Sequence, residues 1–289
     1  MENGINNAQR ALVLVEALPY IQKYNGKIVV VKYGGNAMIN EELKHDVMRD
    51  MVLLHLIGVK VVLVHGGGPE ISGMLKRVGK QSQFVDGLRV TDEETSEIVQ
   101  MVLAGKINKS LVGKFQNLGG KAMGVCGMDG GLIRAAMMDE RLGYVGEITH
   151  VNPQPLLDLL EKGYIPVVST VGYDEEGHAY NINADTAAAS IASSLKAECL
   201  ISMTDTPGLL MDPADPASLI RRIDIQGCEE LKAQGVISGG MIPKIDCCIK
   251  AILDGVRKVF IIDGRQPHAL LVETLTDEGI GTMFKKELA

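Results

Sequence analysis

Residues 27–68, KIVVVKYGGNAMINEELKHDVMRDMVLLHLIGVKVVLVHGGG, carry the pattern that decides the fold. The continuous, β-branched apolar run at 27–35 predicts a buried strand, because strands covered on both faces are apolar throughout. An amphipathic stretch at 41–58 predicts the helix that crosses back, and a second β-branched run at 59–68 predicts the next strand. Strand, helix and strand in this order predict two parallel neighbours in one sheet.

The same alternation continues along the rest of the chain. Residues 153–172, 184–205, 240–264 and 267–284 each read as a helix followed by a strand. Turn residues flanked by short extended pieces at 172–183 predict a hairpin beyond the edge of the sheet. We therefore expect an α/β fold, a three-layer α/β/α sandwich around a mostly parallel central sheet.

The segment ahead of the first strand, residues 1–26, predicts an amphipathic helix. Its apolar residues recur at helical spacing, and they are Ile5, Ala8, Leu12, Val15 and Leu18. Pro19 is expected to kink the helix.

The character of the loops changes near residues 196–200. The loops before this point are rich in glycine, and those after it include TDTPGLLMDPADP and SGGMIPK, which indicates a boundary between two lobes, 27–196 and 197–289.

Composition excludes several classes of protein. A formal net charge of -7 argues against binding to nucleic acid, which depends on clustered Lys and Arg. No apolar run approaches the roughly 20 residues of a membrane span, and the N-terminal segment has no signal-peptide pattern. The five cysteines show neither a disulfide framework nor zinc-ligand spacing, so we expect a cytoplasmic protein with free thiols and no dedicated metal site.

The glycine cluster HGGG at 65–68 is the first candidate for a binding site. Pro69 and Glu70 follow it as the start of a helix, and helix starts bind anions. The cluster matches neither a Walker phosphate loop nor a dinucleotide fingerprint. An oxyanion hole, a phosphate site, a carboxylate site and a plain tight turn therefore all stay open, although the G-x-S-x-G motif of hydrolases does not occur.

Lys32 ends the first strand, Lys244 follows a second glycine loop, and Asp185 opens the helix after 180–183. A lone lysine at a strand end more often reaches solvent, and an acid at a helix start is ordinary. Together, at the carboxyl edge of one sheet, they indicate a site for concentrated negative charge such as a nucleoside triphosphate. His65 is a candidate base, but a structural histidine is the commoner reading.

Seven ordered motifs resemble those of the amino acid kinase family and, within it, the arginine-sensitive members that phosphorylate N-acetylglutamate. They are VVKYGGNAM (30–38), VHGGGPEI (64–71), GLRVTD (87–92), YNINADTAAASIA (180–192), TDTPGLL (204–210), ISGGMIPK (237–244) and DEGIGTMF (277–284). The resemblance covers essentially residues 27–284. It implies ATP-dependent phosphorylation of the side-chain carboxylate of N-acetyl-L-glutamate in arginine biosynthesis, giving N-acetylglutamyl 5-phosphate, with Mg²⁺ held mainly by the nucleotide phosphates.

The resemblance also implies a role for each motif. Lys32 and Lys244 would touch the transferring phosphoryl group, and Asp185 would hold both lysines. The other implied site residues serve the acceptor or the nucleotide. The acceptor residues are Gly67 and Gly68 through their backbone N–H groups, Arg89 at the α-carboxylate and Asn181, and the nucleotide residues are Asp205, Gly208, Leu209, Gly239 and Gly240. Residues 27–196 would then form the acyl-substrate and dimerisation lobe, and residues 197–289 the nucleotide lobe.

Residues 1–26 resemble the oligomerisation helix of hexameric, arginine-inhibited members. The resemblance therefore implies a hexamer built as a trimer of dimers. Arginine would bind between this helix and the C-terminal segment, where Glu278 is the natural partner for a guanidinium and Gly281 belongs to the same pocket. Docking of a PII-type signalling protein is compatible with the resemblance, but no residue supports it.

Several alternatives share parts of this pattern. Carbamate kinase, glutamate 5-kinase, aspartokinase and uridylate kinase share the expected fold, whereas GLRVTD and NINAD favour phosphorylation of N-acetylglutamate. A catalytically silent arginine sensor is a rival of another class, and the presence of both lysines and the aspartate weighs against it. A dinucleotide oxidoreductase is disfavoured because the fingerprint glycine spacing is missing.

Overall fold

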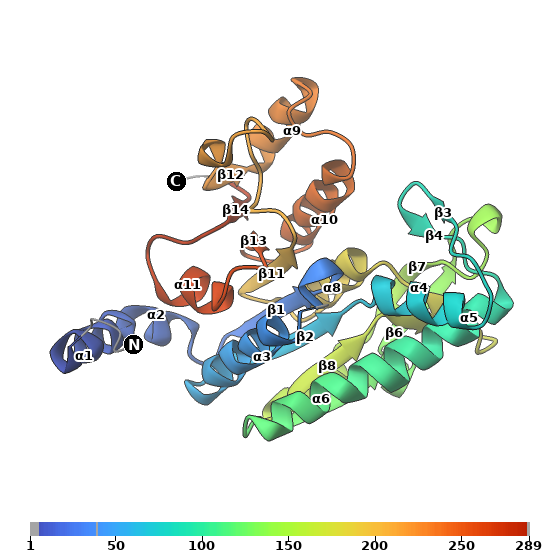
Figure 1. Ribbon diagram of the computed structural model, residues 1–289, viewed down its shortest axis with the longest axis horizontal. Coiled ribbons are helices and arrows are strands. Elements are labelled where there is room, and N and C mark those ends of the chain that lie inside the picture. Colours follow the sequence, from blue (N-terminus) through green and yellow to red (C-terminus); the bar gives the residue numbers. More distant parts are fainter. Residues whose placement is uncertain (1–5, 39, 288–289) are drawn as a thin grey trace.

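The computed structural model describes residues 6–38 and 40–287. Its centre is a sheet of eight strands in the order β12-β14-β13-β11-β1-β2-β8-β5 (Figure 1). These strands are β1 (Ile28–Tyr33), β2 (Lys60–His65), β5 (Ala122–Cys126), β8 (Ile165–Ser169), β11 (Cys199–Thr204), β12 (Arg222–Asp224), β13 (Val259–Asp263) and β14 (Thr282–Lys285). β14 runs antiparallel to β13, and the other neighbouring pairs are parallel, which confirms the mostly parallel sheet.

Helices cover both faces of this sheet, because alternate residues of the buried strands point to opposite sides. Val29 and Val31 of β1 pack into one core, and Val30 packs into the other. The first core holds α3 (Glu41–Leu56), α4 (Gly68–Arg77), α5 (Glu93–Gln100), α6 (Asn108–Asn117) and α11 (Ala269–Leu275). The second holds α7 (Gln154–Glu161), α8 (Ala184–Ser194), α9 (Ile225–Ala233) and α10 (Met241–Leu253). The three-layer α/β/α sandwich is thus confirmed.

The two parts of the chain on either side of residues 196–200 contribute different halves of the sheet. Strands β1, β2, β5 and β8 come from the first part, and β11 to β14 come from the second. β1 and β11 are neighbours at the junction. The carboxyl ends of these two strands therefore lie side by side, with loops from both parts around them.

A smaller sheet of four strands, in the order β10-β9-β6-β7, extends the first part beyond the main sheet. Its strands are β6 (Ile133–Met137), β7 (Gly146–Val151), β9 (Val171–Tyr173) and β10 (Ala179–Asn181). β9 and β10 form the antiparallel hairpin that was predicted at 172–183. A second antiparallel hairpin, β3 (Phe84–Val85) with β4 (Leu88–Arg89), was not predicted.

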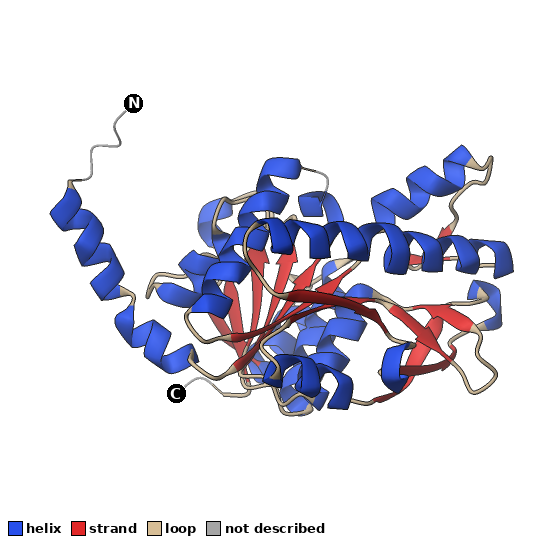
Figure 2. Ribbon diagram, turned by 90° about the horizontal axis from the view of Figure 1, so that it is seen from below, coloured by secondary structure: helices blue, strands red, loops and turns tan. Residues whose placement is uncertain are grey.

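Residues 93–117 form one long helical rod beside the main sheet (Figure 2). Its middle, η2 (Met101–Ile107), is π-helical and joins α5 to α6. The remaining short helices are 3₁₀ turns, namely η1 (Gly35–Met38), η3 (Asp129–Gly131), η4 (Glu140–Leu142) and η5 (Pro216–Ser218). π-helical turns occur often near functional sites because they change the direction of side chains within a helix.

The N-terminal segment forms two short helices, α1 (Asn7–Glu16) and α2 (Leu18–Tyr24), with Pro19 in the first turn of α2. α1 buries none of its residues, and it projects from the body of the molecule (Figures 1 and 2). Leu12 and Val15 of the predicted apolar stripe are exposed, whereas Ile5 lies outside the described residues. Within the described part of the chain, no helix is long and apolar enough to cross a membrane.

Candidate active site

Three charged side chains meet at the carboxyl edge of the main sheet. Lys32 Nζ lies 3.0 Å from Asp185 Oδ1, and Lys244 Nζ lies 3.3 Å from Asp185 Oδ2. Lys32 comes from the end of β1, Asp185 from the first turn of α8, and Lys244 from the first turn of α10. One carboxylate therefore binds two ammonium groups, the arrangement that the family resemblance implied for Asp185.

Local structure explains why Asp185 occupies this position. Asn183 caps α8, and its Oδ1 accepts hydrogen bonds from the backbone N–H groups of Asp185 and Thr186 at 2.9 and 3.1 Å. A carboxylate in the first helical turn is stabilised by the positive end of the helix dipole. Ser202 of β11 lies beside Lys32 in the parallel register, and its hydroxyl donates to Asp185 Oδ1 at 3.2 Å.

The electrostatics of the three side chains favour the ionised carboxylate. Burial alone would raise the pKa of Asp185, but the charges of Lys32 and Lys244 outweigh that cost and lower the pKa to about 2. Asp185 is therefore fully ionised at neutral pH. Two cations and one anion leave a net positive charge of about one at the cluster, which favours an anionic ligand.

A cavity of about 230 Å³ opens beside this cluster. It is lined by six of the residues that the sequence singled out, namely Lys32, Gly67, Gly68, Arg89, Asn181 and Asp185. They come from β1 of the main sheet, β10 of the smaller sheet, β4 of the β3–β4 hairpin, the start of α4 and the first turn of α8. The cavity thus has Lys32 and Asp185 of the charged cluster, together with Arg89, among its lining residues.

The glycine loop supplies bare backbone donors to this cavity. The N–H groups of Gly67 and Gly68 have no hydrogen-bond partner among the described residues, whereas the N–H of Gly66 donates to the carbonyl of Tyr33 at 3.0 Å. A side chain at Gly67 would collide with Ile107 and Leu103 of η2. The π-helical turn therefore packs against one side of the glycine loop, and the N–H groups of the loop remain available to a ligand.

His65 is a structural residue in this arrangement. It is fully buried, and it is not among the residues that line the cavity. Its Nδ1 lies 3.0 Å from the carbonyl of Gly66, which must accept, and its Nε2 lies 3.2 Å from the amide nitrogen of Asn108, which must donate. Burial lowers the pKa of His65 to about 4, so the ring is neutral at pH 7. This supports the structural reading over the catalytic one.

The predicted nucleotide residues fall into two groups. Gly239 and Gly240 line a second cavity, of about 670 Å³, together with Asp185 and Lys244. Gly208 and Leu209 instead pack against Thr282 at the start of β14, whose hydroxyl accepts the N–H of Leu209 at 2.8 Å.

Asp205 follows the carboxyl end of β11, at the same edge as the lysines. Within the described chain, Asp205, Gly208 and Leu209 do not line either of these two cavities.

Glu278 and Gly281 line a separate cavity of about 280 Å³, which, among the described residues, shares no lining residue with the two cavities at the charged cluster. Tyr20 and Lys23 of α2 line it as well, so the N-terminal and C-terminal segments meet there. The backbone of Gly281 is packed against the carbonyl oxygen of Ile261, where any side chain would collide. The structure thus places both predicted residues at one cavity beside the N-terminal helices.

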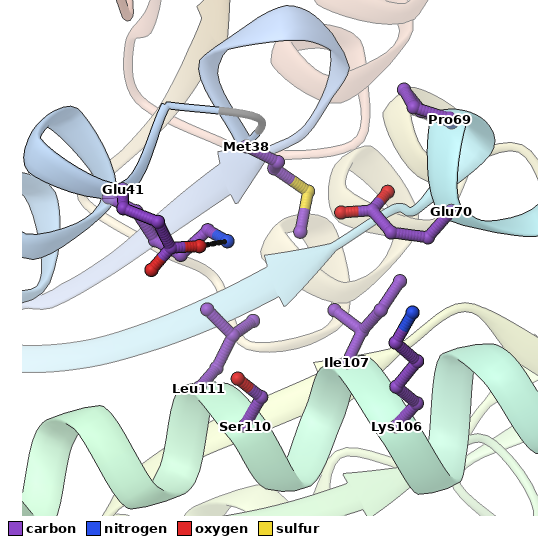
Figure 3. Close-up of a pocket in the computed structure, with 9 residues that line it drawn as sticks. Met38, Glu41, Pro69, Glu70, Lys106, Ile107, Ser110 and Leu111 are labelled. Carbon is purple, nitrogen blue, oxygen red and sulfur yellow. Dashed lines mark hydrogen bonds and ion pairs between the residues drawn. The ribbon is translucent and has the colours of Figure 1, made fainter. Parts of the chain in front are cut away.

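Another cavity, of about 430 Å³, lies between α3, the start of α4 and the long helical rod, and none of the predicted site residues lines it (Figure 3). Glu70, Lys106, Ile107 and Leu111 point into it. One carboxylate oxygen of Glu70 is buried and has no hydrogen-bond partner among the residues that the structure describes. This cavity adjoins the helix that carries the glycine loop, but it does not contain the charged cluster.

Sequence reasoning missed the polar residues that support the site. Ser202 contacts Asp185, Asn183 positions it, and Ser72 and Ser82 contact Arg89. Ser202 becomes a candidate only once β11 is known to pair with β1. Asn183 alone carried a local signal, since Asn two residues before an acid is a common helix cap.

The described residues contain no group of three or more His, Cys, Asp or Glu side chains placed to hold a metal ion, and the five cysteines are unpaired.

Comparison with known proteins identifies the family. The sequence profile described as "Amino acid kinase family" matches residues 27–263. The acetylglutamate kinase of Brachyspira hyodysenteriae is 57% identical over 289 residues, covering 99% of this chain and 100% of that protein. The acetylglutamate kinase of Clostridium beijerinckii is 55% identical over 283 residues, covering 97% of this chain and 99% of that protein.

A solved structure shows a similar fold. The N-acetylglutamate synthase from Neisseria gonorrhoeae, complexed with coenzyme A and N-acetyl-glutamate, matches with a TM-score of 0.83 at 26% identity. The match covers 96% of this chain and 64% of that longer chain. Family profile, full-length relatives and fold agree with the resemblance that the sequence motifs indicated, and the chain belongs to the amino acid kinase family.

Proposed function

We propose that this chain is the kinase that transfers the γ-phosphoryl group of ATP to the side-chain carboxylate of N-acetyl-L-glutamate. The product is N-acetylglutamyl 5-phosphate, an intermediate of arginine biosynthesis. Full-length relatives that are 55% and 57% identical carry the name acetylglutamate kinase. The observation that carries the proposal is the single carboxylate of Asp185 that binds both Lys32 and Lys244 beside the glycine loop.

The chemistry needs charge neutralisation more than proton transfer. A side-chain carboxylate with a pKa of about 4.3 is already ionised at neutral pH, so the acceptor requires no general base. The obstacle is repulsion between this anion and the phosphates. Lys32 and Lys244 offset that repulsion, and the free N–H groups of Gly67 and Gly68 donate hydrogen bonds to oxygens at the reacting centre.

Arg89 and Asn181 bind the other end of the acceptor in this proposal. The guanidinium of Arg89 pairs with the α-carboxylate, because its planar donors match a carboxylate better than a lysine does. Asn181 lines the same cavity and its amide nitrogen donates to Thr91 Oγ1 at 3.3 Å, which orients the side chain. The acetylated amino acid would therefore extend from the glycine loop to the β3–β4 hairpin.

ATP would approach from the other side of the lysine cluster. Gly239 and Gly240 line the larger cavity next to Lys244, and Asp205, Gly208 and Leu209 would form the more distant nucleotide loop. Mg²⁺ fits this site as part of the nucleotide complex. Both oxygens of Asp185 are already bound to lysines, so the ion would be held mainly by phosphates and water, where it neutralises phosphate charge.

The direct test measures ADP release with different acceptors. N-acetyl-L-glutamate is expected to support turnover well above glutamate, aspartate, carbamate and UMP, which are the acceptors of the related kinases considered from the sequence. Hydroxylamine trapping of the product checks that an acyl phosphate forms. Preferred turnover of any of the other four acceptors would contradict the proposal, and no turnover with any acceptor would favour the silent sensor.

We also propose a hexamer, built as a trimer of dimers, through the N-terminal helices. α1 presents Leu12, Leu14 and Val15 to solvent, and none of its residues is buried by the described part of the chain, so its apolar face is available for a second copy. Deletion of residues 1–24 should reduce the assembly to dimers in size-exclusion chromatography with light scattering. A dimer both before and after deletion would contradict this assembly.

Arginine is proposed as an inhibitor that binds in the cavity of about 280 Å³ at α2. Asp277 and Glu278 offer carboxylates for a guanidinium, and Lys23 and Lys258 offer cations for its carboxylate. Glu278→Gln should weaken arginine inhibition while leaving turnover without arginine unchanged.

Nothing in the described residues supports docking of a PII-type protein. The cytoplasm is the proposed site of action because it is where the reduced thiols and the biosynthetic substrates are expected.

A further inference from the structure

Arg89 is a buried cation that lacks a counter-ion. Only 6% of the residue is exposed, and it forms no ion pair with any described residue. Burial lowers its pKa, since the charged form loses hydration. Buried charges are normally paired, so a guanidinium left in this state requires an anion from outside the chain.

Neutral groups from three segments hold the guanidinium in place. Nη1 donates to Ser82 Oγ at 2.5 Å, and Nη2 donates to Ser72 Oγ at 2.9 Å and to the carbonyl oxygen of Gly68 at 3.0 Å. The two serine hydroxyls are themselves linked at 3.3 Å. The guanidinium also lies over the ring of Phe84, its cross-strand partner in the β3–β4 hairpin, at 4.7 Å from the ring centroid.

These contacts fix the side chain without neutralising it. Hydroxyl and carbonyl oxygens satisfy three N–H donors but carry no charge, and a guanidinium has five donors. Arg89 therefore keeps its charge and spare donors for a carboxylate. Because the rotamer is already fixed, binding does not have to order the long side chain, which would otherwise cost affinity.

Gly68 joins the two ends of the acceptor site. Its carbonyl accepts from Arg89, and its unpaired N–H belongs to the glycine loop beside the lysines. Ser72 lies one turn farther along the same helix, α4. Arg89 is thus held against α4, the helix whose start carries the backbone N–H donors. The distance from the guanidinium of Arg89 to these N–H groups is therefore fixed by the geometry of α4.

We propose that Ser72 and Ser82 are positioning residues that fix Arg89 relative to Gly68, so that the site selects dicarboxylate acceptors by their chain length. The inference rests on the proposed function and deepens it by naming the residues responsible for this selectivity. A shorter or longer acceptor cannot place one carboxylate at the lysines and the other at Arg89 without moving the arginine. Loosening the serine contacts relaxes this discrimination.

The test compares serine variants on four acceptors. Ser72→Ala, Ser82→Ala and the double variant are assayed with N-acetyl-L-glutamate, with N-acetyl-L-aspartate, with N-acetyl-L-2-aminoadipate, and with 4-acetamidobutyrate, which lacks the α-carboxylate. Each single variant is expected to raise KM for N-acetyl-L-glutamate by about tenfold, as loss of one hydrogen bond to a charged group predicts. KM for ATP and kcat/KM for 4-acetamidobutyrate stay unchanged.

The double variant should also lower the preference for N-acetyl-L-glutamate over the shorter and longer acceptors by at least about tenfold. Ser72→Thr and Ser82→Thr, which keep the hydroxyl, should restore most of the activity. Ser110→Ala is the matched control, because this exposed serine lines the neighbouring cavity and does not touch Arg89.

The alternative outcomes distinguish a failure of the proposed role of the serines from a failure of the proposed kinase function. A parallel loss of kcat/KM with N-acetyl-L-glutamate and with 4-acetamidobutyrate would show that the serines only support folding, and an unchanged length preference would show that they do not set it. Either result overturns the inference while turnover of N-acetyl-L-glutamate upholds the proposed function. Absence of that turnover in the unaltered protein would overturn the proposed function, and the inference with it.

Discussion

Replacing Asp185 by Asn tests the charged cluster most directly. The change keeps the size and shape of the side chain but removes the charge that binds Lys32 at 3.0 Å and Lys244 at 3.3 Å. The cluster then carries two positive charges instead of a net charge of one. Lys32 has a side chain that is 8% exposed, so water cannot replace the lost partner well.

The size of the effect follows from the pKa of the carboxylate. After the cost of burial, the two lysines lower the pKa of Asp185 from 3.8 to about 2. Since one pKa unit corresponds to about 1.4 kcal/mol, the ammonium groups favour the ionised carboxylate by about 2–3 kcal/mol after the cost of burial. If this energy positions the lysines for phosphoryl transfer, kcat should fall by about 50-fold to 100-fold.

The assay separates binding from turnover. Extra positive charge should leave the Kd for ATP unchanged or lower it, while kcat falls in steady-state measurements at saturating substrates. Asp246→Asn is the matched control, because this exposed carboxylate of α10 pairs with Lys232 at the surface at 2.6 Å. A kcat within threefold of the unaltered enzyme, or an increase in the Kd for ATP that accounts for the whole loss, would refute the reasoning.

Three further predictions concern charge and packing. Lys32→Met and Lys244→Met should each lower kcat at least about 100-fold while circular dichroism shows an intact fold, and normal turnover in either variant would remove that lysine from the reaction. Burial, opposed by a hydrogen bond from His268, raises the pKa of Asp50 from 3.8 to about 6. The folded protein therefore binds the extra proton between pH 4 and 6, and its free energy of unfolding should decrease by about 2–3 kcal/mol as pH rises through that range. Urea titrations of Asp50→Asn should lack this decrease, and a variant that follows the unaltered profile would contradict it. Gly281→Ala places a methyl group against the Ile261 carbonyl and should lower the free energy of unfolding by about 1–3 kcal/mol in thermal melts; an unchanged melting temperature would mean that the backbone shifts freely.

Local sequence patterns predicted most of the main sheet. The buried strand at 27–35 and the strand at 59–68 appear as β1 and β2, because continuous runs of β-branched apolar residues are typical of strands buried on both faces. The helix expected over 41–58 ends at Leu56, two residues early. Gly58 has a φ of 95°, a conformation that glycine adopts easily and that stops a helix.

The β9–β10 hairpin was predicted, but the rest of the smaller sheet and the β3–β4 hairpin escaped prediction for a physical reason. β3 and β4 are only two residues long, and both residues of β3, Phe84 and Val85, are exposed, so no periodic apolar pattern marks this hairpin. Short strands have weak intrinsic preferences, so tertiary contacts decide them. The same holds for the π-helical turn at Met101–Ile107, which packs against Gly67.

The sequence by itself determined the order of strands and helices, the glycine loops at strand ends, and the types of charged group available for chemistry. Those features depend on residues that are close in the chain. Only the tertiary structure decided that β11 lies beside β1, which brings Ser202 next to Lys32, and that Asp185 binds one lysine from β1 and one from α10. It also decided that two serines and a glycine carbonyl hold Arg89, because such contacts arise from packing between separate elements and leave no periodic trace in the sequence.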